Sequence, residues 1–209
     1  MKRILVANAK GGSGKTTLAT QLCGLFASRG MRVVLADMDR QQSATRWLAR
    51  RPALFPKIAG WTPQADREAL KAFDPQWVVY DSPAGLHADK LADLMKRVDL
   101  VVVPVAPSVF DLDASVDFLE ALAAQKAVKK GVSRVALVAN RVDPQTLAAR
   151  ELENFLAAWD LPVLAQLHAA QVYVHCAASG ASLFDLPRSR AMPEVERWEP
   201  LGQWLARHA

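Results

Sequence analysis

Short runs of apolar, often β-branched residues recur along the chain, and longer stretches with helical periodicity lie between them. Consecutive residues within each run are apolar, which predicts strands that are covered on both faces, as in a parallel sheet between layers of helices. The predicted strands are residues 3–8, 32–36, 77–80, 100–105, 134–139 and, from a weaker pattern, 162–166.

The stretches between these runs predict helices. Apolar residues within 16–29 recur every three or four positions, and Gly30 follows, where a helix commonly ends on a left-handed glycine. Further helices are predicted over residues 41–51, 86–97, 114–127, 146–159 and 192–207. Because strands and helices alternate, we predict an α/β fold of one domain, residues 1–209, with a doubly wound, mostly parallel sheet flanked by helices on both faces.

The composition, 51% hydrophobic and 22% charged, is that of a globular chain with a full core. The first apolar run is too short for a signal peptide, and Lys10 follows it closely. The longest later run, residues 100–109, is broken by Pro104 and Pro107 and has about half of the ~20 residues that a membrane-spanning helix needs. We therefore expect a cytoplasmic protein without a transmembrane segment.

The thiols and imidazoles do not suggest a metal centre. Cys23 and Cys176 are far apart in the sequence, which predicts two packed free thiols and excludes the clustered cysteines of an iron–sulfur enzyme. The four histidines have no metal-ligand spacing, and we expect His168 and His175 to be surface or hydrogen-bonding residues.

A glycine-rich segment stands between the first predicted strand and the first predicted helix. Glycines let the backbone N–H groups turn toward phosphate oxygens, and the helix N-terminus adds its positive dipole end. Lys15 is expected to reach the β- and γ-phosphates of ATP, and the Thr16 hydroxyl to bind Mg²⁺. A strict P-loop has a glycine in place of Ala9. The predicted binding residues are Lys10, Gly11, Gly12, Ser13, Gly14, Lys15, Thr16 and Thr17.

Aspartates follow the second and third predicted strands. Asp37 and Asp39 alternate at a strand end, so both can point at one ligand site; we assign Asp37 to Mg²⁺ and Asp39 to orienting the attacking water. Asp81 follows four apolar residues, as in a Walker B motif, and is a further predicted Mg²⁺ residue. Aspartates at strand ends also commonly cap helices, which is the alternative for Asp37 and Asp39.

The segment Lys10-Gly11-Gly12-Ser13-Gly14-Lys15-Thr16-Thr17 resembles the deviant Walker A motif of the ParA/MinD family of P-loop ATPases, whose signature lysine corresponds to Lys10. This resemblance implies that Lys10 crosses a dimer interface to the partner's ATP and neutralises transition-state charge, so that Lys10, Lys15 and Asp39 are the catalytic residues. Residues 83–85 resemble the family's switch segment. Asn140 and Arg141 stand where relatives often contact adenine, although a strand-end turn is the other interpretation.

The resemblance extends along residues 105–108, 171–173 and 180–184 and is closest to short ParA-type partition proteins without an N-terminal DNA-reading domain. Two positions depart from the family pattern: Arg40 replaces a proline after Asp39, and Ala170 replaces a common arginine. The family implies an ATP-bound homodimer that binds DNA without sequence preference and a small partner protein that stimulates hydrolysis. The leading hypothesis is an ATPase that partitions plasmid or chromosome DNA and associates with the nucleoid when ATP-bound.

The sequence leaves two alternatives open. Relatives of the ParA type also position protein clusters or DNA-transfer complexes, and the sequence does not separate these cargoes. A MinD-like membrane regulator needs a basic amphipathic C-terminal helix, but Glu194, Glu196 and Glu199 crowd the polar face of the tail, and Pro200 interrupts it. We therefore expect the tail to pack on the sheet rather than to insert into a membrane.

The positive charge is concentrated at the N-terminal end of the chain. The formal net charge is +5; residues 1–60 have 11 Lys and Arg against 2 Asp and Glu, which leaves 15 against 19 for residues 61–209. We select arginines as candidate DNA contacts, with a solvated surface as the alternative. They are Arg188 and Arg190 in the loop before the last helix and, as a second choice, Arg46, Arg50 and Arg51.

Overall fold

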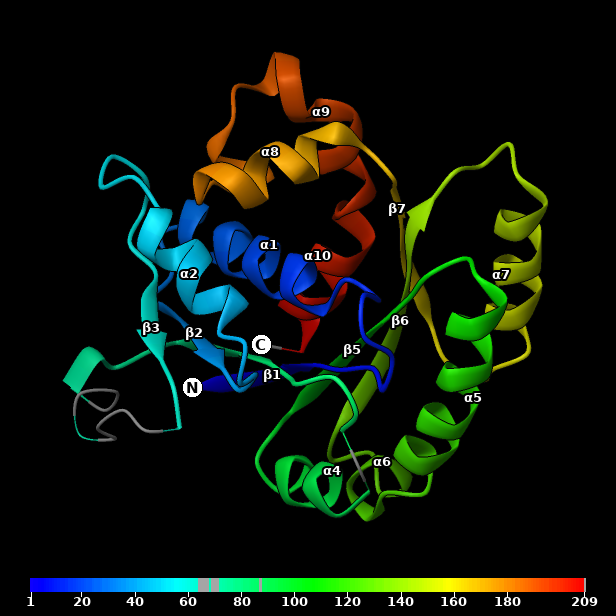
Figure 1. Cartoon of the computed structure of the whole chain (residues 1–209). Coiled ribbons are helices and arrows are strands. Elements are labelled where there is room, and N and C mark those ends of the chain that lie inside the picture. The colour runs from blue at the N-terminus through cyan, green and yellow to red at the C-terminus, as the bar shows by residue number, and fades with distance from the viewer. Residues whose placement is uncertain (64–67, 69–71, 87, 209) are drawn as a thin grey trace.

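The computed structural model describes residues 1–63, 68, 72–86 and 88–208, and its seven strands form one sheet of order β3-β2-β4-β1-β5-β6-β7 (Figure 1). All hydrogen-bonded strand pairs are parallel, which confirms the predicted fold class. The strands are β1 Lys2–Val6, β2 Val33–Asp37, β3 Ala59–Trp61, β4 Trp77–Asp81, β5 Leu100–Val105, β6 Arg134–Val142 and β7 Val163–His168.

Helices cover both faces of the sheet. On one face lie α1 (Lys15–Ser28), α2 (Ser43–Arg50), α8 (Gln171–Ser179), the short 3-10 helix η1 (Leu183–Asp185), α9 (Arg188–Arg197) and α10 (Glu199–Arg207). The other face is covered by α4 (Ala88–Met95), α5 (Val109–Ala123) and α7 (Leu147–Ala157), with α6 (Lys126–Lys129) after α5.

Successive side chains of a strand point to opposite faces of the sheet, so the core forms one cluster under each layer of helices. In β1, Ile4 and Val6 belong to the cluster under α1, whereas Leu5 belongs to the cluster under α5 and α7. All three side chains are fully buried, because a central parallel strand faces helices on both sides. Cys23 and Cys176 are buried free thiols, as predicted, and burial raises the pKa of the Cys176 thiol to about 11.

Several elements differ from the sequence-based prediction. Strand β3 was not predicted, since it has only three residues and is partly exposed at the sheet edge. Helix α8 was also missed. Helix α5 begins at Val109 instead of residue 114, because the Ser108 hydroxyl accepts a hydrogen bond from the Asp111 backbone N–H at 3.2 Å and caps a helix whose first turn exposes apolar residues.

The prediction of one helix over residues 192–207 was wrong. Helix α9 ends at Arg197 and α10 begins at Glu199, because Pro200 has no amide hydrogen with which to continue the first helix. Helix α9 also begins at Arg188 instead of residue 192, so Arg188 and Arg190 lie in its first turn and not in a loop.

The C-terminal helices pack on the sheet, as expected from the sequence. Trp198, Leu201 and Leu205 are each at most 1% exposed and belong to the cluster under α1. Within the described residues, the helices lack the length and apolar character that would be needed to cross a lipid bilayer.

A buried ion pair joins α2 to η1. The Arg51 guanidinium donates to both carboxylate oxygens of Asp185 at 2.8 Å, and the two side chains are 5% and 0% exposed. The Gly180 carbonyl accepts a further bond from Arg51 at 3.1 Å. Such a pair fixes the position of α2, the helix that follows Asp37 and Asp39.

Replacing Asp185 by alanine should lower the free energy of unfolding by about 3–5 kcal/mol, because the Arg51 charge would stay buried without its partner. Urea denaturation followed by circular dichroism measures this change. The matched control is Asp93→Ala, which removes an exposed ion pair with Lys96 and should cost less than about 1 kcal/mol. Equal losses for the two variants would contradict a structural role for the Arg51–Asp185 pair.

Candidate functional site

The order of the strands reverses at β1, which lies between β4 and β5, and the candidate site is at the carboxyl ends of these strands. The register pairs Asp81 at the end of β4 with Val6 on one side and with Asp37 at the end of β2 on the other. The glycine-rich loop follows β1 directly, so the topology brings this loop and the aspartates together.

The loop has the curled backbone that a phosphate cradle requires. Gly12 and Gly14 have φ angles of +82° and +97°, which side chains rarely allow. Gly14 is also closely covered, since a Cβ atom there would lie 1.9 Å from the Asn140 amide nitrogen. Helix α1 begins at the next residue, so its free N–H groups and its positive dipole end face the loop.

Lys15 has a buried ammonium group inside the loop. Its side chain curls back, and Nζ donates to the Lys10 carbonyl at 2.7 Å while the residue is 7% exposed. Burial lowers the pKa of Lys15 from its ordinary value, and the nearby carboxylates of Asp81 and Asp39 oppose that shift. A cation held with so little solvent is stabilised by an anion, and a phosphate group would supply one.

Asp81 lies beside Thr16 and is 1% exposed. Its Oδ2 atom accepts a hydrogen bond from the Thr16 hydroxyl at 2.7 Å, whereas its Oδ1 atom is buried and has no hydrogen-bond partner in the described part of the chain. Burial raises the pKa of Asp81 to about 7, against the effect of the Thr16 hydrogen bond. A buried carboxylate oxygen without a partner beside a hydroxyl fits a hard cation such as Mg²⁺.

The carboxylate of Asp37 accepts hydrogen bonds from residues of the following turn and helix. Oδ2 accepts from the Thr45 backbone N–H at 2.8 Å and from the Thr45 hydroxyl at 2.9 Å, and Oδ1 accepts from the Asp39 N–H at 3.1 Å. Asp37 thus stabilises the first turn of α2, which is the helix-capping role given above as the alternative to binding Mg²⁺. Its predicted role in binding Mg²⁺ stays a prediction. The described residues contain no group of three or more acidic, histidine or cysteine side chains arranged to hold a metal.

Asp39 lies in the turn between β2 and α2. Its Oδ1 atom accepts from the Gln41 N–H at 2.9 Å, and the Gln42 N–H donates to its carbonyl at 3.0 Å. Gln42 has a φ of +53°, so the turn that contains Arg40 in place of the family's proline closes through a left-handed residue. Asp39 contributes to the electrostatic field on Lys15 and Asp81, which places it near both.

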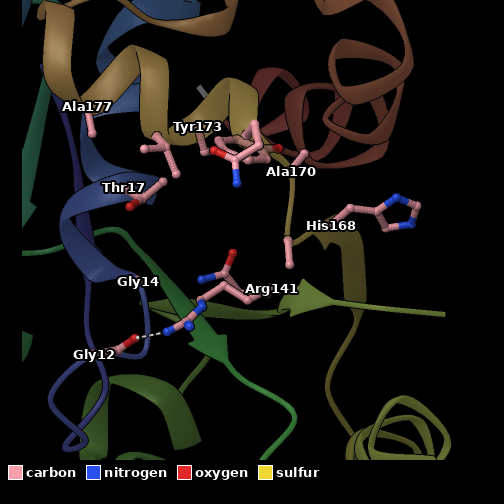
Figure 2. Close-up of a pocket in the computed structure, with 12 residues that line it drawn as sticks. Gly12, Gly14, Thr17, Arg141, His168, Ala170, Tyr173 and Ala177 are labelled. Carbon is pink, nitrogen blue, oxygen red and sulfur yellow. Dashed lines mark hydrogen bonds between the residues drawn. The ribbon is translucent and has the colours of Figure 1, made fainter. Parts of the chain in front are cut away.

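The segment Asn140–Arg141 contacts the phosphate loop from the other side. The Asn140 amide donates to the Ser13 carbonyl at 2.8 Å. The Arg141 guanidinium donates to the Gly12 carbonyl at 3.4 Å, as the dashed line in Figure 2 shows. Arg141 has a φ of +58°, at an irregularity where the pairing of β6 with β7 shifts register. Both residues therefore support the loop, and their predicted contact with adenine stays a prediction.

A cavity of about 460 Å³ opens between the loop, the end of β7 and α8. Figure 2 shows Gly12, Gly14 and Arg141 on one side and Tyr173 and Ala170 on the other. The volume lies within the range of small-ligand pockets. Ala170, which replaces the family's arginine, leaves the wall at this point without a charged side chain.

A polar network behind the cavity was not predicted. The Tyr173 hydroxyl donates to Glu194 at 3.1 Å and accepts from the Trp198 indole N–H at 3.0 Å, and the Arg197 guanidinium donates to Glu194 at 3.2 Å. Glu194 is 7% exposed, and burial raises the pKa of Tyr173 above its ordinary range. The assignment of Glu194 to the polar face of the tail was wrong, because Glu194 shares a helical face with the buried Ala191 and Trp198, where a charged residue needs a partner.

The five candidate DNA contacts differ in exposure. Arg46, Arg188 and Arg190 are exposed. Arg50 is exposed but donates to the Ala177 carbonyl at 2.9 Å. The choice of Arg51 was wrong, because its guanidinium is buried against Asp185 and is not available to a phosphate.

Comparison with known proteins connects this site to a family. The model of the CobQ/CobB/MinD/ParA nucleotide-binding domain matches residues 4–183. The chain is 30% identical over 192 residues to the maintenance of carboxysome distribution protein A of Halothiobacillus neapolitanus, covering 88% of this chain and 87% of that protein. It is also 30% identical over 192 residues to the chromosome-partitioning ATPase Soj of Thermus thermophilus, covering 76% of each.

Solved structures support the fold assignment. An ATP complex of McdA from Cyanothece superposes with a TM-score of 0.72 over 97% of this chain and 96% of that chain, at 17% identity. At this identity the likeness concerns the fold alone.

In metal-free buffer with EDTA, Asp81→Asn should raise the melting temperature, and the gain should be larger at pH 8 than at pH 5. The native pKa of Asp81, about 7, lies above its ordinary value of 3.8. Between these values the native state keeps a proton that the unfolded state releases, so the free energy of unfolding falls as pH rises toward 7. Asparagine does not titrate and avoids this loss. Thermal unfolding at both pH values checks the sign; a gain that is the same at pH 5 and pH 8 would contradict it.

Proposed function

The chain belongs to the CobQ/CobB/MinD/ParA nucleotide-binding family, and on that premise we propose that it is an ATPase of ParA type that dimerises with ATP, binds DNA without sequence preference and positions a cargo. The observation that carries this proposal is that a buried lysine and a buried carboxylate oxygen without a hydrogen-bond partner lie at the same site. At the carboxyl edge of the sheet, the positive charge of Lys15 is suited to a phosphate, and the negative charge of Asp81 is suited to the metal ion bound with that phosphate.

In the proposed complex, the N–H groups of residues 10–17 and the Lys15 ammonium hold the phosphates. Thr16 and Asp81 hold Mg²⁺, with Asp37 near them through the sheet register. The ion would offset the negative charge of the phosphates. The base would occupy the cavity of about 460 Å³, with Asn140 and Arg141 keeping the loop against it.

For hydrolysis we propose that Asp39 orients a water molecule toward the γ-phosphorus. The water oxygen forms a bond to phosphorus as the bond to the ADP oxygen breaks, which yields ADP and phosphate. Asp39 is half-buried at the carboxyl edge and acts electrostatically on Lys15, which supports this role. Lys10 from a second copy would neutralise charge that develops in this transition state.

Exposed apolar residues support dimerisation through the nucleotide edge. Val109 and Phe110 begin α5 at the carboxyl end of β5 and are 60% and 76% exposed. Asp111, the next residue, acts on the charge of Lys15, so this turn lies near the phosphate loop. A second copy that covers this edge would bury both side chains beside ATP.

A hydrogen bond connects the wall of the cavity to α9, the helix that contains two of the candidate DNA-binding residues. Tyr173 lines the cavity and hydrogen-bonds Glu194, and Arg188 and Arg190 lie on the same helix as Glu194. A nucleotide that moves α8 would therefore move α9. This contact supports nucleotide-gated DNA binding and association with the nucleoid in the ATP state.

For the cargo we propose plasmid or chromosome DNA, with a small partner protein that stimulates hydrolysis. A second candidate is a protein assembly. The alignment with the carboxysome-distribution relative supports it, because that alignment covers 88% of this chain against 76% for the chromosome-partitioning relative.

Lys10→Ala should leave the affinity for ATP within a few-fold of the parent but abolish the ATP-dependent dimer, because the Lys10 side chain is proposed to act across the interface. Light scattering with a nonhydrolysable ATP analogue measures the dimer, and calorimetry measures the affinity. Lys57→Ala, which removes an exposed charge elsewhere, is the control. Equal dimer fractions in the variant and the parent would exclude the proposed interface role of Lys10.

The double variant Arg188→Ala, Arg190→Ala should weaken DNA binding in the ATP state by about tenfold or more. Each phosphate contact that is lost should reduce the log–log salt slope by about 0.9. Filter binding at moderate salt with ATP, with ADP and without nucleotide measures this effect, and Lys57→Ala is again the control. Nucleotide-gated attachment fails if the parent binds equally in all three states, and the assignment to α9 fails if the double variant binds like the parent.

A further inference from the structure

Five basic residues form an exposed surface at the amino ends of the strands, opposite the nucleotide edge. We name it the amino-edge patch and define it as Arg97, Lys126, Lys129, Lys130 and Arg134. Arg97 precedes β5, the lysines lie in and just after α6, and Arg134 begins β6. In Figure 1, α4 and α6 both appear at this end of the sheet.

Hydrogen bonds fix the segments of the patch to each other. The Ser133 hydroxyl donates to the Val98 carbonyl at 2.7 Å and is buried, and the Arg134 N–H donates to the Asp99 carbonyl at 3.0 Å. The Val132 N–H donates to the Ala127 carbonyl at 2.9 Å, which closes the turn after α6. The five charges are therefore held on one rigid base that joins β5, α6 and β6.

Two acidic residues near the patch, Asp99 and Asp93, have hydrogen-bond partners outside it. Asp99 accepts a hydrogen bond from the Arg3 backbone N–H at 2.8 Å, and Asp93 pairs with Lys96 at 2.7 Å. In the described part of the chain, no carboxylate lies within ion-pair distance of the five patch side chains. Glu120 on α5 is the remaining exposed acid close in sequence to α6. The five cations thus share one surface with Asp93, which interacts electrostatically with Arg97, and with Asp99, so positive charge exceeds negative charge there.

We propose that the amino-edge patch is a second DNA-binding surface that contacts the phosphates of duplex DNA without requiring a nucleotide. The hydrogen bonds that build the patch involve neither the phosphate loop nor the cavity, so its geometry does not depend on ATP. The excess of cations over carboxylates on this surface favours a polyanion such as duplex DNA.

A membrane surface fits the patch less well. Val132 is 69% exposed, but it is a single apolar side chain among cations, and stable membrane association needs a broader apolar face or a lipid anchor. In the dimer proposed above, the nucleotide edges face each other and the two patches point outward.

Fluorescence anisotropy of the full chain with a labelled duplex of arbitrary sequence, without nucleotide and at low salt, tests the proposal. With all five cations in contact, the log–log salt slope should approach about −4 to −5. The double variant Lys129→Ala, Lys130→Ala should weaken binding at least tenfold and make the slope shallower by about 2. The matched control Lys57→Ala, Arg150→Ala removes the same charge from exposed positions elsewhere.

The outcomes separate this surface from the gated one on α9. Loss of nucleotide-free binding in the patch variant alone, with ATP affinity unchanged by calorimetry, supports the proposal whether or not ATP adds further binding. Equal losses in the patch and control variants would show an effect of net charge and overturn it. Co-sedimentation with phosphatidylserine vesicles but no binding to the duplex would also overturn it, in favour of a membrane surface.

Discussion

The contact between Thr16 and Asp81 determines the arrangement of the site. It joins the first turn of α1 to the end of β4 over 65 positions of sequence and leaves the other oxygen of Asp81 buried without a partner. Lys15 lies beside it with its ammonium group returned to the Lys10 carbonyl. Both charges are costly where they stand, because little solvent and few protein groups stabilise them. Phosphate and Mg²⁺ would supply what each charge lacks, so the same burial that destabilises the free protein favours the bound state.

The remaining contacts of the site hold the loop between two halves of the sheet. Asn140 binds the loop from β6 while Asp37, through Thr45, holds the first turn of α2. Behind the cavity, Tyr173 and Glu194 connect α8 to α9 by a buried hydrogen bond. A bound nucleotide would touch the phosphate loop directly. The helices α2, α8 and α9 would respond through contacts that are already formed. A conformational switch requires such an arrangement, because a few contacts that each join separate elements can transmit a change from the nucleotide to the rest of the chain.

Much of the fold and of the phosphate loop could be predicted because the signals are local. The apolar runs gave the long strands, and the glycines with Lys15 and Thr16 indicated the cradle without any tertiary information. Predictions were wrong where contacts between residues that are distant in sequence determine the structure. Arg51 resembles a surface cation in sequence, and only Asp185, 134 positions away, shows that it is buried. Strand β3 is stabilised by pairing with β2 rather than by its own pattern, and the cavity wall depends on α8, which sequence periodicity did not reveal.

We propose that Lys15 is held in place for a phosphate, and titration calorimetry of Mg²⁺-ATP into the parent and into Lys15→Ala measures what its ammonium group contributes to binding. We predict that the parent binds and that the variant, which should melt at or above the parent's temperature because a buried charge is gone, loses affinity by at least about thirtyfold, equivalent to about 2 kcal/mol. A folded Lys15→Ala variant with the parent's affinity for Mg²⁺-ATP would contradict the claim.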